Sequence, residues 1–380
     1  MLIVVPAETA ETERRVALVP DAVKKLSKLG LTLKIESGAG LKTGYSDQDY
    51  LSAGAEIETD RSALLGQADI VLRVQKPSIS DIDLLKAGCI QISYLDPYNE
   101  PTLIDKLAEK SITAISMEMI PRTTRAQKMD ALSSQANLAG YVMVIIAAQK
   151  LDRILPMMMT PAGTLSPAKV FVIGAGVAGL QAIATAKRLG ARVEAFDTRP
   201  VVAEQVRSLG AKFVEIDLGT TGQTEAGYAK ELTAEQLELQ RQGMKSVISA
   251  ADIVITTAQL FGRPAPKIVT HDMVEVMKPG GVIVDMAVDS GGNVDGSIPD
   301  QTVDVGGVSI IGMSNLPAEV CKDASQMYAS NLVNLVTEFW DPENESFALN
   351  LDDDILSGCV ITTAGSIVNQ SILSLRNQES

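Results

Sequence analysis

Histidine is almost absent from this sequence, which holds one such residue, His271, among 380. A Ser-His-Asp or Cys-His catalytic arrangement would have to use it, and a metal site built from several histidines is excluded. His271 follows Thr270 at the expected start of a short helix, so we expect an exposed first-turn side chain without a catalytic role. We predict no metal site.

Cysteines and aromatic residues are also scarce. Cys89, Cys321 and Cys359 form no C-x-x-C pair, which argues against a zinc or disulfide framework and is typical of a reducing cytosol. An aromatic content of 4% leaves few stacking platforms for single-stranded nucleic acid. With 33 basic against 47 acidic residues, the net charge of −14 argues against binding a phosphate backbone. We therefore predict no nucleic-acid partner.

Long apolar runs are missing as well. The longest strictly apolar run, Tyr141–Ala148, has eight residues, whereas a membrane helix needs about 20. The N-terminus has neither a basic start nor a cleavage site, so we expect no signal peptide. These patterns predict a cytoplasmic chain without a membrane span of its own.

Apolar runs and helical patterns alternate along the first third of the chain. The length predicts two domains, and the alternation predicts an α/β fold with mostly parallel sheets. The expected strands are Leu2–Val5, Asp69–Val74, Ile90–Leu95 and Ile112–Met119, and helical patterns include Asp21–Leu29 and Asp81–Lys86.

Two long helical patterns mark the expected domain boundaries. Leu138–Leu151 is apolar on nearly all faces, which predicts a buried helix that joins two domains. We interpret the Met157–Met159 cluster after it as packing at this junction. Glu319–Phe339 is expected to cross back, which makes the first domain discontinuous. The predicted domains are residues 1–136 with 320–380, and residues 137–319.

From Lys169 onward the alternation becomes regular and predicts a doubly wound nucleotide-binding sheet. Its sharpest motif is Gly174-Ala-Gly-Val-Ala-Gly179, directly after the strand Val170–Ile173 and at the start of a helix. The first glycine permits a tight turn, Gly176 lets the backbone approach a pyrophosphate, and Gly179 lets helix and strand pack closely. The helix N-terminus then offers N–H groups to the anion.

Asp197 ends the second strand of this pattern, 18 residues after Gly179. A carboxylate there can accept from a ribose 2′-hydroxyl and would repel a 2′-phosphate, so NAD(H) is favoured over NADP(H). Arg199 complicates this, because an arginine just beyond the strand can accept a 2′-phosphate. The candidate cofactor contacts are Gly174, Gly176, Val177, Ala178, Gly179, Asp197, Thr198, Arg199, Gly227, Tyr228, Thr257, Ala258 and Gln259.

Asp217–Gln242 interrupts the alternation. It begins with a glycine-punctuated, polar stretch and continues into the polar helical pattern ELTAEQLELQRQ. Composition allows two interpretations, a mobile loop at about residues 217–242 that closes over a ligand, or a disordered insertion.

The N-terminal stretch VPAETAETERRVALVPDAVKKLSKLG resembles the alanine dehydrogenase and transhydrogenase superfamily. Pro121–Tyr141, which begins PRTTRAQKMDALSSQAN, is similar to the signature loop of the NAD(H)-binding subunits of proton-translocating NAD(P) transhydrogenases. The resemblance covers essentially the whole chain. It implies two Rossmann-like domains, the first discontinuous and alanine dehydrogenase-like, in a homodimer, with Tyr228 on a mobile loop.

The resemblance also assigns roles in the signature loop. Arg122, Gln127, Asp130 and Ser133 match residues that hold the nicotinamide carboxamide and its ribose, and Gln127 would also reach towards the NADP(H)-binding partner. These are the candidate catalytic residues, and they position the ring without acid–base chemistry. Alternatively, the loop is a polar turn in which Asp130 and Ser133 cap the following helix.

Two positions separate the chain from alanine dehydrogenases. That family places a catalytic lysine and a histidine where this sequence has Gln75 and Asp96, while Arg15 resembles its substrate-carboxylate arginine. Reductive amination needs a cation and a proton donor, which glutamine and an ionised carboxylate do not supply. Hydride transfer between two nicotinamides needs positioning of the rings and exclusion of water instead.

The resemblance implies an NAD(H)-binding subunit that presents NADH for hydride transfer to NADP⁺ on a partner, coupled to proton translocation. The partners would be a second copy of the chain and separate membrane-spanning and NADP(H)-binding subunits. The chain would then dock peripherally on the cytoplasmic face of the inner membrane. Two alternatives remain, an alanine dehydrogenase-type enzyme and a non-catalytic NADH-sensing module.

Overall fold

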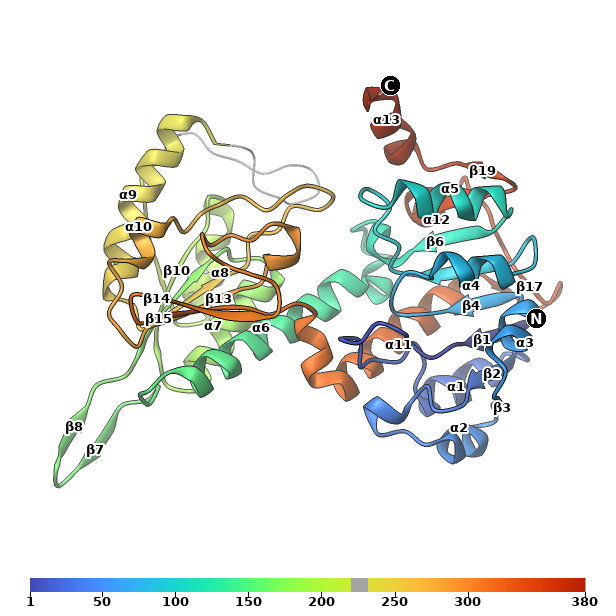
Figure 1. Cartoon of the computed structure of the whole chain (residues 1–380), viewed down its shortest axis with the longest axis horizontal. Coiled ribbons are helices and arrows are strands. Elements are labelled where there is room, and N and C mark those ends of the chain that lie inside the picture. Colours follow the sequence, from blue (N-terminus) through green and yellow to red (C-terminus); the bar gives the residue numbers. More distant parts are fainter. Residues whose placement is uncertain (220–231, 380) are drawn as a thin grey trace. The chain divides into compact units, whose positions relative to one another are not determined.

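The computed structural model describes residues 1–219 and 232–379, and in these the chain forms two compact units. Unit 1 consists of Met1–Gln135 together with Ala318–Ser380, and unit 2 is Ala136–Pro317 (Figure 1). Each unit is built on its own mixed, mostly parallel sheet. The predicted α/β fold with a discontinuous first unit is confirmed. The two units separate between residues 135 and 136 and between residues 317 and 318. These positions lie within two residues of the predicted domain boundaries at 136/137 and 319/320, and the domain boundaries themselves stay predictions.

The sheet of unit 1 has eight strands in the order β19-β18-β6-β5-β4-β1-β2-β3. β1 to β6 are parallel, whereas β18 pairs antiparallel with both β6 and β19, so the C-terminal segment completes the sheet begun by the N-terminal one. The strands are β1 (Leu2–Val5), β2 (Thr32–Glu36), β3 (Glu56–Glu58), β4 (Ile70–Leu72), β5 (Ile90–Ser93), β6 (Thr113–Ser116), β18 (Val360–Thr363) and β19 (Ser366–Ile367).

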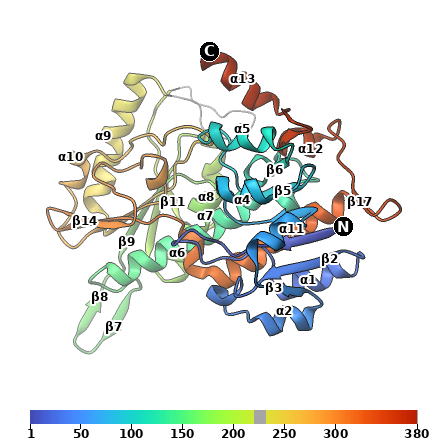
Figure 2. The same ribbon diagram turned by 45° about the vertical axis from the view of Figure 1, so that its right-hand side comes forward.

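Helices cover both faces of this sheet because its central strands are apolar on both sides. Figures 1 and 2 show helices on both faces of the sheet. In β1, Ile3 and Val5 pack in a core with α1 and α11, while Val4 faces a second core with α3 and α5. The helices of unit 1 are α1 (Pro20–Ser27), α2 (Asp47–Ala53), α3 (Arg61–Gly66), α4 (Ile79–Leu84), α5 (Pro101–Glu109), α11 (Cys321–Glu338), α12 (Asp354–Cys359) and α13 (Gln370–Glu379). Its short 3₁₀ turns are η1 (Leu41–Thr43), η2 (Met117–Met119) and η3 (Gln127–Met129), and β16 (Trp340–Asp341) pairs with β17 (Ser346–Phe347). A further 3₁₀ turn, η6 (Leu316–Val320), begins in unit 2 and ends in unit 1.

The sheet of unit 2 has seven strands in the order β11-β10-β9-β12-β13-β15-β14, all parallel except β14. The order reverses between β9 and β12, which is the switch point of a doubly wound nucleotide-binding sheet. The strands are β9 (Lys169–Ile173), β10 (Arg192–Phe196), β11 (Lys212–Phe213), β12 (Ile253–Thr256), β13 (Val282–Asp285), β14 (Gln301–Val305) and β15 (Val308–Gly312).

The helices of unit 2 pack against both faces of its sheet. Phe171 and Ile173 of β9 share a core with α9 and α10, while α7 lies against β9 and β10. The elements are α7 (Val177–Arg188), α8 (Ala203–Ser208), α9 (Ala234–Ala250), α10 (His271–Val274), η4 (Pro200–Val202) and η5 (Val288–Ser290). Residues 234–242 of the predicted mobile loop are thus helical, which matches the polar helical pattern there, and residues 220–231 lie outside the described residues.

Helix α6 (Ala131–Lys150) begins in unit 1 and continues into unit 2. It is the one helix in the described residues that is long and apolar enough to cross a membrane, a property that buried core helices share. A Cβ atom at Gly140 would lie 2.2 Å from the Ala178 carbonyl oxygen, so α6 packs closely on α7. The expectation of burial on nearly all faces is wrong, because Tyr141 and Ile145 are 42% and 37% exposed.

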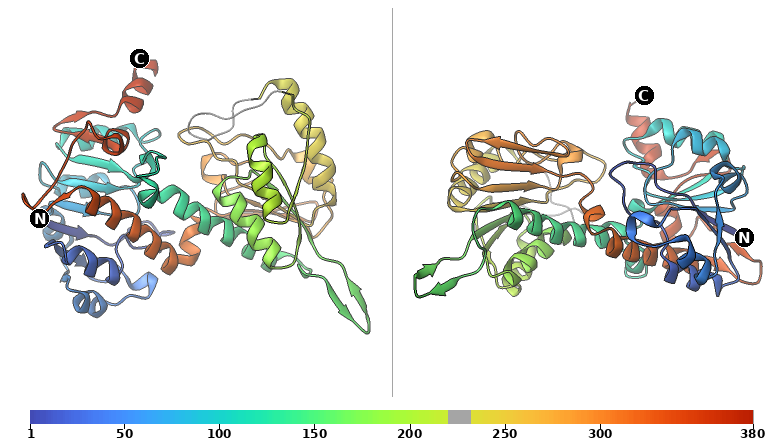
Figure 3. Two further views of the ribbon diagram at one scale, coloured as in Figure 1. Left: turned by 180° about the vertical axis from the view of Figure 1, so that it is seen from behind. Right: turned by 60° about the horizontal axis from the view of Figure 1, so that its bottom comes forward.

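A two-stranded hairpin follows α6 and extends from the rest of unit 2 (Figure 3). It consists of β7 (Met158–Thr160) and β8 (Gly163–Leu165), and every residue of both strands is exposed. The interpretation of Met157–Met159 as junction packing is therefore wrong, since Met157 and Met159 are 62% and 72% exposed. Side-chain composition could not reveal this, because a methionine cluster suits a core and an interface equally.

Candidate functional site

The glycine turn after β9 has the geometry that a pyrophosphate site requires. Gly174 has φ +95°, which disfavours any side chain, and a Cβ atom at Gly179 would lie 1.9 Å from the Gly174 carbonyl oxygen. Gly179 therefore allows close packing of α7 on the turn. A Cβ atom at Gly176 would meet nothing within 4 Å, so the backbone there is open to an approaching group. Val177 and Ala178 begin α7, whose free N–H groups suit an anion.

Asp197, directly after β10, is hydrogen-bonded to both the glycine turn and Arg199. Its carboxylate accepts from the Ala175 amide (2.8 Å) and from the amide, Nε and a terminal nitrogen of Arg199 (2.8, 2.9 and 2.8 Å). These hydrogen bonds raise the pKa of Arg199. Asp197 thus balances the charge of Arg199, whose role the sequence did not decide. This ion pair competes with any binding of a 2′-phosphate by Arg199.

A cavity of about 180 Å³ lies beside this carboxylate, at the carboxyl ends of β10 and β11. Its walls include Asp197, Thr198, Phe213, Glu215 and Asp217. An adenosine group held by Asp197 through its ribose would lie on this side of the switch point.

The candidate contacts after β12 are joined to the same turn. The Thr257 hydroxyl donates to the Gly174 carbonyl oxygen at 3.1 Å, and the Gln259 side chain donates to the Met286 carbonyl oxygen at 3.2 Å. Ala258 lies between them and is held through both its backbone groups by Asn293. The structure thus brings together the predicted residues of unit 2 that it describes, while Gly227 and Tyr228 lie outside the described residues.

The predicted nicotinamide residues lie in unit 1, on the segment before α6 and on its first turn. Asp130 caps α6, since its carboxylate accepts from the Ser133 amide at 2.8 Å and from the Ser133 hydroxyl at 2.6 Å. The structure therefore contains the helix-capping contact between Asp130 and Ser133 that the alternative interpretation of this loop predicts. Arg122 and Gln127 are exposed, and Gln127 begins η3. Contact of these four residues with a nicotinamide stays a prediction.

Ion pairs hold this segment on unit 1. Arg125 pairs with Asp353, Asp354 and Glu338, and Lys128 pairs with Glu338 at 2.6 Å. The Lys128 carbonyl oxygen also accepts from the side chains of Asn331 and Asn334 in α11. Ala126, between these two anchors, and Met129, directly after the second, are buried. The segment is therefore fixed at both charged and apolar points, with Gln127 presented outward.

Arg15 and Gln75, two of the positions compared with alanine dehydrogenases, both contact the buried Glu13 in unit 1, whereas the Asp96 side chain is 46% exposed. Arg15 pairs with Glu13 through two nitrogens (2.8 and 2.6 Å) and donates to Gln135, while the Gln75 amide donates to Glu13 at 2.7 Å. Burial opposes ionisation of Glu13, but the Arg15 hydrogen bonds hold its pKa below its usual value. Asp96, at the histidine position, is paired with exposed Lys76 at 3.6 Å. Glu13 therefore balances the Arg15 charge, and Gln75 adds none.

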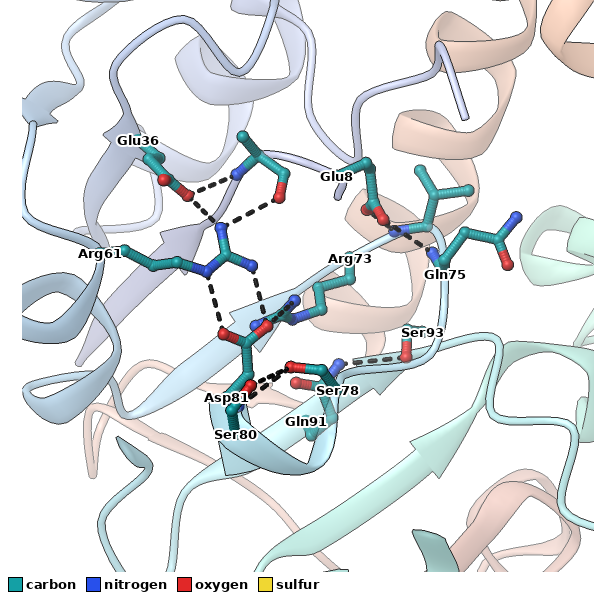
Figure 4. Close-up of polar contacts among 12 residues, drawn as sticks. Glu8, Glu36, Arg61, Arg73, Gln75, Ser78, Ser80, Asp81, Gln91 and Ser93 are labelled. Atoms are coloured by element: carbon teal, nitrogen blue, oxygen red, sulfur yellow. Dashed lines mark hydrogen bonds and ion pairs between the residues drawn. The ribbon is translucent and has the colours of Figure 1, made fainter. Parts of the chain in front are cut away.

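A neighbouring network fixes the segment that carries Gln75 (Figure 4). Glu8 accepts from the Val74 and Gln75 amides at 2.6 and 3.3 Å. Burial raises the pKa of Glu8 to about 7, although the Val74 amide and the Arg73 charge oppose this shift. Arg73 in turn pairs with Asp81 at 2.8 Å.

Metal-ligating side chains do not cluster in the described residues. Within residues 1–219 and 232–379, no group of three or more His, Cys, Asp or Glu side chains could hold a metal ion. The three cysteines are buried free thiols, and burial raises the pKa of Cys89 and Cys359 to about 12. His271 is exposed in the first turn of α10 and lies 3.4 Å from Glu275, as its sequence position predicts.

Sequence analysis missed one residue of the nucleotide region, Asn293. It follows two glycines, Gly291 and Gly292, in the loop after β13, and its side chain is fully buried. The Gly-Gly-Asn sequence after the buried strand β13 could have pointed to Asn293. Loops that follow the parallel strands of a doubly wound sheet form its ligand-binding crevice.

Comparison with known proteins identifies the family. Residues 4–139 match the alanine dehydrogenase/PNT N-terminal domain, and residues 143–370 match the C-terminal domain of the same family. The first of the parts that form the NAD(P) transhydrogenase alpha subunit of Rhodospirillum rubrum is 44% identical, with 98% of this chain and 99% of that protein covered. The crystal structure of a transhydrogenase from Sinorhizobium meliloti superposes with a TM-score of 0.88 at 44% identity, covering 97% and 100% of the two chains.

Alanine dehydrogenases are more distant relatives. The enzyme of Halomonas elongata is 30% identical over 94% of this chain and 92% of its own length. The resemblance of essentially the whole chain to transhydrogenases is thereby confirmed. The chain belongs to the alanine dehydrogenase/PNT family and, within it, to the proteins that form the first part of the NAD(P) transhydrogenase alpha subunit.

Proposed function

We propose that this chain binds NAD(H) in unit 2 and presents its nicotinamide for direct hydride transfer to NADP⁺ on a partner subunit, coupled to proton translocation. The observation that carries the proposal is the 44% identity to the Rhodospirillum rubrum protein over 98% of the chain. The glycine turn and Asp197 support the cofactor assignment, because they supply the two anchors that a dinucleotide needs.

The chain's own groups hold the cofactor in this proposal. The pyrophosphate lies over Gly176, where the backbone is open, against the N-terminus of α7. The Asp197 carboxylate accepts from the 2′-hydroxyl of the adenosine ribose. NADP(H) carries a phosphate at that position, so this contact selects NAD(H). NADH supplies the hydride from C4 of its dihydronicotinamide, so the protein needs no acid or base at the reacting carbon.

The loop of unit 1 positions the nicotinamide. Arg122 donates to the carboxamide oxygen, while Asp130 and Ser133 accept from its nitrogen or from the nearby ribose. Gln127, which is exposed, reaches towards the NADP(H)-binding partner. Ring position decides the rate of hydride transfer, because reacting atoms must approach to about 3–3.5 Å.

A second copy of the chain completes the proposed assembly. Both strands of the β7–β8 hairpin are exposed, and an isolated two-stranded hairpin is marginally stable in water. Packing of Met157, Met159 and Leu165 against a second copy would cover this apolar surface. Through the membrane-spanning and NADP(H)-binding subunits, the dimer docks on the cytoplasmic face of the inner membrane.

Reconstitution tests the proposed function. The purified chain is mixed with the NADP(H)-binding subunit of a related transhydrogenase, and the rate of NADP⁺ reduction by NADH is followed as the chain is titrated. A saturable rate that requires both proteins is expected. NADH binding without any transfer would favour a sensing module, and NADH oxidation that requires pyruvate and ammonium would favour an alanine dehydrogenase.

A further inference from the structure

Asn293 is a buried amide that holds a backbone segment of the nucleotide region. Its side chain is fully buried and makes three hydrogen bonds, all to backbone. The Ala258 amide donates to Oδ1 at 3.0 Å, and Nδ2 donates to the carbonyl oxygens of Ala258 and Pro266 at 2.9 Å each. Only Nδ2 can donate to a carbonyl, so the partners fix the orientation of the amide.

Asp285, at the end of β13, places Asn293. Its fully buried carboxylate accepts from the backbone amide of Asn293 at 2.9 Å and from that of Val294 at 3.2 Å. A Cβ atom at Gly292, where φ is +79°, would lie 2.8 Å from this carboxylate. The loop can therefore close over Asp285 in this way only with glycine at 292.

Ala258 connects this loop to the glycine turn. The preceding residue, Thr257, donates to the Gly174 carbonyl oxygen at 3.1 Å. A Cβ atom at Gly174 would lie 2.6 Å from the Thr257 hydroxyl, so the two segments are in close contact. A continuous polar path thus runs from Asp285 through Asn293, Ala258 and Thr257 to the first glycine of the dinucleotide motif.

The sheet order assigns this path to one half of a dinucleotide. Asp197 follows β10 and Ala258 follows β12, and these strands flank β9 on opposite sides. In doubly wound sheets the two mononucleotide halves lie on either side of the switch point. The adenosine half belongs to the Asp197 side, so the segment Thr257–Gln259 faces the nicotinamide half.

We propose that Asn293 is a positioning residue for the nicotinamide half of the site, which it serves by fixing the backbone at Ala258 against the Gly174 turn. It touches no atom of the cofactor and acts through Ala258 and Thr257. This inference rests on the proposed function, because it assumes that unit 2 binds NAD(H).

The test compares Asn293→Ala with a matched control, Asn369→Ala. Asn369 is 3% exposed, lies in unit 1 and also makes three bonds to backbone, with Gly358, Ser371 and Ile372. The dissociation constants of NADH and of 5′-AMP are measured by calorimetry on the full chain, together with the melting temperature. The nucleotide 5′-AMP occupies the adenosine half alone, so it reports on folding of the site without the nicotinamide contacts.

Both substitutions should lower the melting temperature. Asn293→Ala should weaken NADH binding about tenfold, as expected if the displaced Ala258 segment loses one hydrogen bond to the cofactor, and should change 5′-AMP binding less than about twofold. Asn369→Ala should change neither affinity. If Asn293→Ala does not fold, Thr257→Val, which removes the hydroxyl bond to Gly174, should show the same selective loss of NADH affinity.

Unchanged NADH affinity in folded Asn293→Ala, or an equal loss of NADH and 5′-AMP affinity, would overturn the positioning role. An NADH loss in Asn369→Ala as large as that in Asn293→Ala would do the same. Failure of the wild-type chain to bind NADH would instead refute the proposed function itself.

Discussion

The substitution Asp197→Asn tests how the chain selects its nucleotide. In the structure, protein groups make four hydrogen bonds to the Asp197 carboxylate, one from Ala175 and three from Arg199. A carboxylate has about four lone-pair sites, so a ribose hydroxyl must displace a group of Arg199. Asparagine removes the negative charge and so releases the guanidinium towards a 2′-phosphate.

The expected change in nucleotide affinity follows from this exchange of hydrogen-bond partners. A hydrogen bond to an ionised carboxylate contributes about 1.5–3 kcal/mol, which equals about 10- to 150-fold in affinity. Because NADH gains this bond at the expense of one Arg199 contact, we expect the lower end, an about tenfold weaker NADH complex. NADPH should bind more tightly, since Arg199 no longer pairs with a carboxylate, and this gain should shrink at high salt.

Calorimetric titrations with NADH and NADPH at fixed ionic strength measure the effect. The control is Glu215→Gln, which removes a carboxylate from the wall of the same cavity, where Glu215 is exposed and paired with Arg207. This control should leave the ratio of the two affinities unchanged. If Asp197→Asn keeps the wild-type preference for NADH, the assigned role of Asp197 is wrong.

Three further results are expected. Gly176→Ala should abolish NADH binding and leave the melting temperature, measured by calorimetry, unchanged. Gly179→Ala should also lower the melting temperature, because its Cβ atom would overlap a backbone carbonyl group. Burial raises the pKa of Glu8 from 4.5 to about 7, so folding favours its protonated form and the wild-type free energy of unfolding falls as pH rises through this range. Glu8→Gln should therefore gain stability relative to wild type between about pH 5 and pH 8 in denaturant titrations, and a constant difference would contradict this. Arg125→Met should slow reconstituted hydride transfer about tenfold while changing NADH affinity little, because it frees the loop but leaves unit 2 intact; an equal loss of both would contradict the reasoning.

Much of the fold could be predicted because its signals are local. The nucleotide-binding pattern is one example: strand Val170–Ile173, the glycine motif and the acidic Asp197 follow one another at the expected spacing. This order and spacing are typical of one fold, the dinucleotide-binding βαβ unit. The discontinuous first unit also followed from the long helical pattern that became α11. These features depend on periodicity and backbone conformation, which a single sequence carries directly.

Features set by tertiary contacts could not be predicted. The exposure of Met157 and Met159 depends on a hairpin that extends from unit 2, and no local pattern distinguishes this from core packing. The pairing of Arg199 with Asp197 is a choice of rotamer made in the folded chain. Asn293 acts through Ala258, a contact across 35 residues that spacing alone does not reveal.

Isotope tracing tests the central claim most directly. NADH carrying deuterium at both C4 positions is incubated with the chain, the NADP(H)-binding subunit and NADP⁺, and the NADPH formed is examined by mass spectrometry. Direct transfer between two nicotinamides predicts that the label arrives undiluted at C4 of NADPH, because the hydride never exchanges with water. NADPH that lacks the label, or that forms equally well without this chain, would contradict the proposed function.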